Sequence, residues 1–280
     1  MRSLGRRRIF LRIAFHIALA VSGFFYMYPF AWMLSGSLKS QPDLLGSGLH
    51  LWPQRLAWGN YVQAWQRARF GIYFRNTVFV TLMTTLIVVA LTSLAGYALA
   101  RSDFPGKKFV VGSILVTMFL PRGYTVVPIF ELVKRLGLLN TLWAVVLVNA
   151  ATAMVFNTFL FVGYFATLPG ELEEAATIDG ASFPRIYWRI ALPLAKPMIG
   201  TVALFEFIDN WNSFFIPLVF TLGRPDLRTV VVGMYAFVGQ HSTDWTLMYA
   251  AATMSLLPTM LVFFLLQRLF VEGVAGAIRG

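Results

Sequence analysis

Six apolar runs dominate this sequence, and each is long enough to cross a bilayer as a helix, which takes about 20 residues. The chain has 280 residues, of which only 12% are charged, whereas a soluble domain carries about 25%. Backbone groups in lipid need internal hydrogen-bond partners, so continuous runs of this length form helices rather than barrel strands. The sequence therefore predicts an all-α integral membrane protein with six transmembrane helices, at about residues 13–34, 78–100, 109–130, 142–166, 198–222 and 247–270.

Basic residues predict how these helices are oriented. Thirteen lysines and arginines lie at the two termini and in the connections after the second and fourth runs, and nine lie in the other connections. Five of the thirteen are arginines directly before the first run, where positive charge has most effect on insertion. We therefore expect both termini and residues 169–197 in the cytoplasm, and we attribute the net charge of +11 to topology, with no nucleic-acid partner. The first run is longer than a signal-peptide core, so we interpret it as a retained anchor.

Enzyme chemistry has little support in this chain. It has no cysteine and only three scattered histidines, so we expect no catalytic residues and no metal site. A phosphate-cradling loop needs G-x-x-x-x-G-K-[ST]. The only Gly-Lys pair, Gly106-Lys107, is followed by Lys108 and has Arg101 at the first glycine position. We therefore expect one membrane domain over 1–280, with no cofactor of its own.

One polar segment, residues 169–197, separates the fourth and fifth apolar runs. Acidic residues around Glu174-Ala175-Ala176 predict the start of a helix, because they lie near the positive end of its dipole. Pro184 is expected to end this helix or begin the next, and Pro193 and Pro197 to interrupt the chain. Small residues in this segment would allow another surface to approach the backbone closely.

The spacing of this segment resembles the cytoplasmic signature of ABC-importer membrane subunits: EAA, three residues, Gly, nine residues, then Ile-x-Leu-Pro. Further similarities run nearly end to end and narrow the resemblance to the smaller, maltose-permease type of carbohydrate importer. They comprise Asn60-Tyr61, Arg75-Asn76-Thr77, Arg101 to Lys107, Pro121, Pro128, Gly137 to Thr141, Trp211-Asn212, Pro217, Gln267-Arg268, Gly273 and Gly276 to Gly280. Glu272 departs from the family pattern, in which a neutral or small residue is expected.

The resemblance implies an architecture and a set of partners. It implies six transmembrane helices in the cytoplasmic membrane, a cytoplasmic EAA coupling loop, and half of a translocation path for a sugar. The implied partners are a second permease subunit, two ATP-binding subunits that hold ATP and Mg, an external substrate-binding protein and membrane lipid.

The resemblance also implies which residues contact the ATP-binding subunits. Glu174 would pair with an arginine there, and the small residues would allow a close fit. The coupling residues so implied are Glu174, Ala175, Ala176, Asp179, Gly180, Ile190, Leu192 and Pro193. The tail residues implied to reach the ATPase are Gln267, Arg268, Gly276 and Arg279. Asp179 has an alternative interpretation as a cap or turn residue.

Polar residues in the fifth apolar run are candidates for the translocation path, because charge within a membrane is costly and usually functional. Glu206, Asp209 or Asn210, and Ser213 share one helical face at spacings of three and four residues. The candidates are Glu206, Asp209, Asn210, Trp211, Asn212 and, in the third run, Arg122. The alternative is that they hold helices together, or, for Arg122, that the cation reaches outward to the interface.

Two other functions stay open at this point. An importer for a different small solute, such as glycerol phosphate, would share these features. A secondary transporter would work alone, and the EAA spacing would then have no explanation.

Overall fold

The structure, a computed structural model, describes residues 2–46, 48, 50–119, 125–239 and 243–278. Within these residues the chain is helical apart from turns and one isolated antiparallel bridge, between Val238 and Thr243. It forms two compact units: unit 1 is Met1–Phe70 with Met234–Leu256, and unit 2 is Gly71–Gly233 with Leu257–Gly280. The prediction of an all-α protein is therefore confirmed for the described residues.

Unit 1 is held together by buried polar contacts around the end of its first helix. Its elements are α1 (Arg2–Ser37), α2 (Gln41–Gly46), α3 (Gly59–Arg67), η4 (Tyr235–Phe237) and the first turns of α14 (Trp245–Ile278). The side-chain amide of Asn60 donates to the carbonyls of Ser37 and Lys39, at 2.9 and 2.8 Å. The buried Lys39 ammonium donates to the carbonyl of His50 and lies 5.0 Å from the ring centroid of Trp32. The bond to Ser37 satisfies the last carbonyl of α1, which has no partner within the helix.

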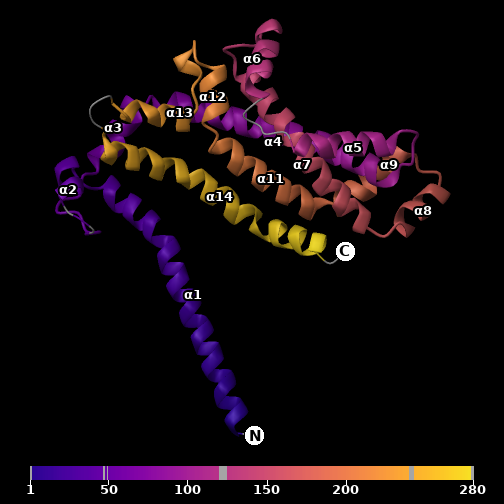
Figure 1. Cartoon of the computed structure of the whole chain (residues 1–280), viewed down its shortest axis with the longest axis horizontal. Helices are drawn as coiled ribbons and strands as arrows, with labels where there is room; N and C mark the ends of the chain where they lie inside the picture. Colours follow the sequence, from indigo (N-terminus) through magenta and orange to yellow (C-terminus); the bar gives the residue numbers. More distant parts are fainter. Residues whose placement is uncertain (1, 47, 49, 120–124, 240–242, 279–280) are drawn as a thin grey trace. The chain divides into compact units, whose positions relative to one another are not determined.

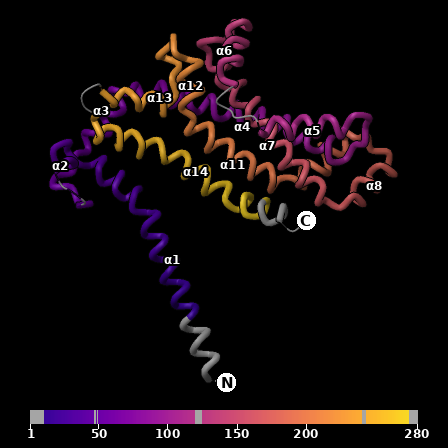
Figure 2. Tube along the Cα trace, viewed as in Figure 1, coloured from indigo at the N-terminus to yellow at the C-terminus, as the bar shows by residue number. Residues whose placement is uncertain are grey.

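Unit 2 consists mainly of long helices (Figures 1 and 2), which pack around two clusters of buried hydrophobic side chains. α5, α11 and α12 all contact α7, and α8 lies at one end of the unit, well apart from α6 and α12. The elements are α4 (Phe70–Arg101), α5 (Lys107–Met118), α6 (Val126–Arg135), α7 (Leu142–Thr167), α8 (Glu171–Ile178), α9 (Phe183–Ile186), η2 (Tyr187–Ala191), α10 (Leu192–Leu194), α11 (Lys196–Trp211), α12 (Phe215–Phe220), η3 (Pro225–Leu227), α13 (Val230–Met234) and the rest of α14.

Four described helices are long and apolar enough to cross a membrane. They are Leu11–Ser37, Phe70–Arg101, Leu142–Thr167 and Trp245–Gly273, and a bent pair, Phe183–Leu194 with Lys196–Trp211, makes a fifth if it is one span. The most apolar stretch of the first is not buried against the described residues. That exposure is what a helix facing lipid or another chain requires.

Two of the six apolar runs do not form single helices over the described residues. The run at 198–222 divides because α11 ends at Trp211 and α12 begins at Phe215. The side chain of Asn212 donates to the Ile208 carbonyl at 2.7 Å, which completes the end of α11 locally. The run at 109–130 contains α5, which ends at Met118, and the start of α6 at Val126; residues 120–124, with Pro121 and Arg122, lie outside the described residues.

The predicted interruption before α11 is present, but it is not at Pro193. Pro184 begins α9, and the helix then continues through the π-helical turn η2 into α10, which contains Pro193. A proline removes one backbone donor and crowds the preceding turn, and the wider π-helical turn just before it relieves that crowding. The chain bends by 74° between Leu194 and Lys196, directly before Pro197.

Candidate coupling surface and intramembrane polar site

α8 forms an exposed face in the segment that the sequence predicts to couple to an ATPase. The predicted helix start is confirmed, since α8 begins at Glu171 with three acidic residues in its first turn. Glu174, Ala175 and Asp179 are exposed, and Ile178 is 86% exposed at the end of the helix. Ala176 is partly buried and packs against the core. The face therefore combines an anion, small residues and an apolar tip.

Gly180 ends α8 in a left-handed conformation, with φ +78°. Its N–H donates to the Thr177 carbonyl and that of Ala181 donates to the Ala176 carbonyl, at 3.0 and 2.9 Å. This pair of bonds is the Schellman motif, in which glycine is preferred because it has no Cβ to strain. No atom lies within 4 Å of where a Cβ at Gly180 would be. Asp179 occupies the C-cap position, as its alternative interpretation as a cap residue supposes.

Glu173, which sequence reasoning passed over, is the residue that attaches α8 to the rest of unit 2. Its carboxylate accepts from Arg101 Nε at 2.9 Å and from the Tyr97 hydroxyl at 3.2 Å. Glu173 and Glu174 are neighbours in an acidic run, so the local sequence does not show which one faces inward. The available signal was Arg101 at the end of a membrane helix, where a cation needs a partner.

The second half of the signature lies beyond the turn at Gly180, in η2 and α10. Ile190 and Leu192 are partly buried and pack against the core, whereas Pro193 is exposed. Tyr187, one turn earlier, is buried and shares a 2.8 Å hydrogen bond with the Ser93 hydroxyl of α4. The structure therefore places Glu174 and Ala175 on a surface, and Ile190 and Leu192 against the core.

Three of the four tail residues lie on the last turns of α14. Gln267 and Arg268 are exposed, and Arg268 forms a 3.0 Å ion pair with Glu272 one turn later. Glu272, the departure from the family pattern, thus has a partner of its own. Gly276 is within the helix, and Arg279 lies outside the described residues.

A buried polar network joins α11 to α7. Glu206 is 6% exposed and its carboxylate accepts from the side-chain amides of Asn157 at 2.7 Å and Asn210 at 3.2 Å. The side-chain carbonyl of Asn210 accepts from the amide of Asn149 at 2.8 Å. Buried polar groups of this kind need partners, and Glu206 and Asn210 find theirs on the neighbouring helix. Asn149 and Asn157 could not be selected from the sequence, because their pairing depends on the packing of two helices.

The remaining candidates of α11 have different surroundings. Asp209 is exposed and lines a hollow of about 300 Å³ together with Thr152 and Phe156 of α7. Trp211 is 1% exposed and stacks on Phe207 with ring centroids 5.3 Å apart. Ser213, predicted to share a face with Glu206, lies beyond the end of α11. Arg122 lies outside the described residues.

The chain has an exposed amphipathic loop between membrane helices and a polar network buried between α7 and α11. This arrangement suits a transport subunit. A protein-family comparison agrees: the family of binding-protein-dependent transport system inner membrane components matches residues 93–276. The chain belongs to this family. It is thus a membrane-embedded transport subunit rather than an enzyme, and the ATPase is a separate subunit.

Individual relatives extend the match to 90% or more of the chain. The chain is 34% identical to the probable ABC transporter permease protein YurM of Bacillus subtilis, over 90% of this chain and 84% of the relative. It is 32% identical to the trehalose/maltose transport system permease protein MalG of Thermococcus litoralis, over 98% and 99%. It is also 33% identical to the melibiose/raffinose/stachyose import permease protein MelC of Bacillus subtilis, over 91% and 92%.

A solved structure has the same fold. It is the crystal structure of a bacterial ABC transporter involved in the import of the acidic polysaccharide alginate, which matches with a TM-score of 0.80 and 24% identity over 94% of this chain and 97% of that chain. The likeness establishes the ABC-permease fold for this importer subunit.

Proposed function

We propose that this permease subunit imports a sugar or sugar derivative and forms half of the translocation path. Relatives named for trehalose/maltose, melibiose/raffinose/stachyose and diacetylchitobiose support this substrate class. Other relatives are named for osmoprotective compounds and for sulfoquinovosyl glycerol. A different small polyhydroxylated solute is therefore the second candidate.

In this proposal the chain crosses the membrane six times, with both termini and residues 169–197 in the cytoplasm. The four long helices and the bent pair ending in α11 supply five crossings. The third apolar run supplies the sixth, starting with α5. Arginines before the first run support the cytoplasmic N-terminus.

The complete importer in this proposal contains a second permease subunit, two ATP-binding subunits and an external binding protein, with ATP and Mg on the ATP-binding subunits. The tail residues Gln267, Arg268, Gly276 and Arg279 contact the ATPase as well. Substrate delivery and energy supply then both come from partners, which is consistent with a chain that carries no phosphate-cradling sequence.

The coupling surface of the proposal is the exposed face of α8, with Glu174, Ala175, Ala176, Asp179 and Gly180. The observation that carries it is the different environment of two adjacent acids. Glu173 is held inside by α4, whereas Glu174 is exposed. An exposed carboxylate between small residues suits a charge-assisted pair with an arginine of a docking protein. The second arm of the loop comprises α9, η2 and α10. In this proposal it is held in place by Ile190, Leu192 and Pro193.

For the translocation path we propose Asp209 and Asn212 as exposed polar groups and Glu206 and Asn210 as the support behind them. Asp209 lines hollows that also contain Thr152 and Ser213, and such groups can exchange hydrogen bonds with sugar hydroxyls. Trp211 packs within the chain and shapes the path without presenting an open face. Arg122 stays a path candidate on sequence grounds.

The proposal is tested on the purified importer with Glu174→Ala. Loss of a charge-assisted pair should weaken retention of the ATPase, or ATP hydrolysis stimulated by the sugar-loaded binding protein, by about tenfold. Glu171→Ala is the matched control, because it removes another exposed acid from the same helix. If Glu174→Ala retains wild-type assembly and stimulation, α8 is not the coupling surface.

A further inference from the structure

The end of α4 and the coupling helix α8 are joined through a single carboxylate. We propose that Arg101 and Tyr97 of α4 hold Glu173 of α8 so that a displacement of α8 by the ATPase is transmitted directly to α4. Glu173 and Arg101 are positioning residues in this view, since they contact neither sugar nor nucleotide. The inference rests on the proposed coupling role of α8 and adds the route by which its motion enters the membrane helices.

The contacts of Glu173 are well shielded. The Arg101–Glu173 ion pair has an N–O distance of 2.9 Å, and the two side chains are 18% and 16% exposed. In each of the other four described ion pairs, the more exposed side chain is at least 57% exposed. A shielded, charge-assisted pair is less weakened by water and salt than an exposed one. This pair can therefore transmit force where surface pairs would give way.

Arg101 also binds a second element. Its Nη2 donates to the carbonyl of Leu168 at 2.6 Å, and Leu168 is the C-cap of α7. The last carbonyls of a helix have no partner within it, so this bond completes the end of α7. One guanidinium thus links the ends of α4 and α7 to α8.

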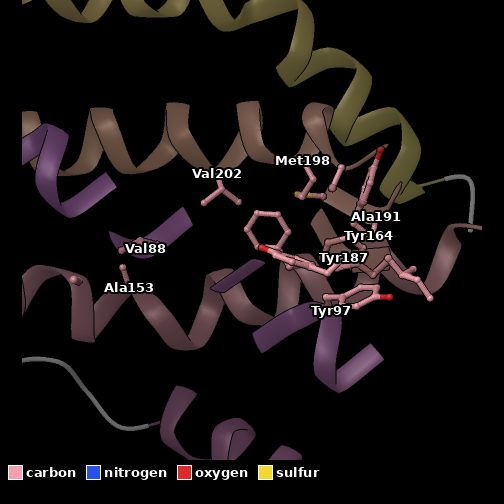
Figure 3. Close-up of a cluster of buried hydrophobic side chains, with 13 residues drawn as sticks. Val88, Tyr97, Ala153, Tyr164, Tyr187, Ala191, Met198 and Val202 are labelled. Carbon is pink, nitrogen blue, oxygen red and sulfur yellow. The ribbon is translucent and has the colours of Figure 1, made fainter. Parts of the chain in front are cut away.

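Tyr97 attaches the other arm of the loop to the same turn of α4. Its ring lies 4.8 Å from that of Phe183 and 5.3 Å from that of Tyr187, measured between centroids, and its hydroxyl donates to Glu173. Figure 3 shows Tyr97 and Tyr187 side by side, in the cluster that Met198 of α11 also enters. Both arms of the loop therefore converge on one turn of α4.

No second route of this kind leaves α8 in the described structure. Among the described residues, Glu173 makes every side-chain hydrogen bond between α8 and another helix. The remaining attachments of this arm are apolar, through Ala176 and Ala181. Removing the Glu173 contacts should leave the exposed docking face of α8 intact. The helix α8 could then move without displacing α4.

The test compares Glu173→Ala, Arg101→Ala and the double variant in the reconstituted importer, at matched complex abundance. We expect ATP hydrolysed per solute imported to rise about fivefold in each single variant, a change of the size that loss of one charge-assisted bond produces. Because both residues act through one contact, the double variant should be no worse than Arg101→Ala alone. Asp103→Ala is the control, since it removes an exposed ion pair close to the same helix end.

Two further variants keep the test informative if an alanine variant does not assemble. Glu173→Gln preserves size, and Tyr97→Phe removes only the hydroxyl while keeping the ring contacts. Each should raise the ATP-to-solute ratio in the same direction by a smaller factor. Wild-type ratios in assembled variants, or defects that multiply in the double variant, would overturn the shared contact. If wild-type ATPase is not stimulated by the loaded binding protein, the proposed function itself fails.

Discussion

Gly180 can be explained in two ways that predict different orders of substitution. If another protein packs closely on this glycine, added volume is what harms, and alanine is tolerated better than asparagine. If the left-handed backbone at φ +78° is the reason, asparagine is tolerated better, because its side chain accepts that conformation more readily. The open space around the position and the two capping bonds favour the conformational explanation within this chain.

We therefore predict that Gly180→Asn retains more binding-protein-stimulated ATP hydrolysis than Gly180→Ala. The alanine variant should lose about 1 kcal/mol of stability at the end of α8. Stimulated hydrolysis is measured in the purified importer, with Gly163→Ala as a control at a glycine that also has open space but lies within a regular helix. The reverse order of activities would identify close packing by a partner as the determinant.

The buried network of Glu206 provides a second test at this scale. Asn157→Leu removes the hydrogen bond that Asn157 donates to the Glu206 carboxylate, so we expect a loss of about 1–2 kcal/mol. Asn157→Leu with Glu206→Leu should be less harmful than Asn157→Leu alone, since the buried carboxylate is then removed together with its donor. Thermal unfolding of the purified complex measures both.

Asp209→Asn tests whether Asp209 lines the translocation path or supports the helix packing, when sugar uptake is measured beside thermal unfolding. It should lower sugar uptake with an unchanged melting temperature, because Asp209 is exposed and outside the network. A lowered melting temperature with uptake reduced in proportion would place Asp209 among the residues that hold helices together.

The close contact of α11 with α14 in unit 2 depends on two glycines. A Cβ at Gly200 would lie 2.5 Å from Cβ of Leu269, and one at Gly273 would lie 2.7 Å from the carbonyl oxygen of Pro197. The second clash involves backbone, so it cannot be relieved by rotating a side chain. Small residues that permit such an approach are typical of helix pairs in membranes.

Gly273→Ala should accordingly separate α14 from the start of α11 and cost about 1–3 kcal/mol. Gly163→Ala, in the interior of α7 with open space around it, should be neutral or stabilise by up to about 1 kcal/mol. The two variants are compared by thermal unfolding of the complex. Equal melting temperatures would mean that the helices can adjust to the added methyl group.

At the element scale, the sequence predicts helices better than it predicts their breaks. The start of α8 followed from local charge, and proline placed the start of α9. The end of α11 at Trp211 did not follow, because apolar composition continues to residue 222 and the break depends on how Asn212 bonds to its own helix. Pro193 was a misleading signal, since a π-helical turn accommodates it.

At the scale of the whole molecule, long apolar runs and the EAA spacing were enough to predict the class of protein. The contacts that organise residues 169–197 were not predictable in the same way. Glu173 is 72 residues from Arg101, and the choice between two adjacent glutamates depends on the packing of α4 against the loop. Composition is enough to predict membrane insertion, whereas the partner of each side chain is determined only in the folded chain.

Topology is a property of the whole molecule, and the absence of cysteine makes it directly measurable. Single cysteines at Ser40, Ser102, Ser182 and Ser242 should divide into two groups toward an impermeant thiol reagent. Ser40→Cys and Ser242→Cys should react in intact cells, because the basic residues assign them to the outer face. Ser102→Cys and Ser182→Cys should react only after lysis.

Ser182 decides this last prediction, because it is exposed between α8 and α9 and its accessibility depends on the side of the membrane alone. Reaction of Ser182→Cys in intact cells would place the coupling loop outside, where no ATP-binding subunit could reach it. Ser40→Cys supplies the internal control, since it is also exposed in the described structure and should react before lysis. If Ser40→Cys reacts before lysis and Ser182→Cys reacts only after it, α8 lies on the cytoplasmic side, where an ATP-binding subunit can move it.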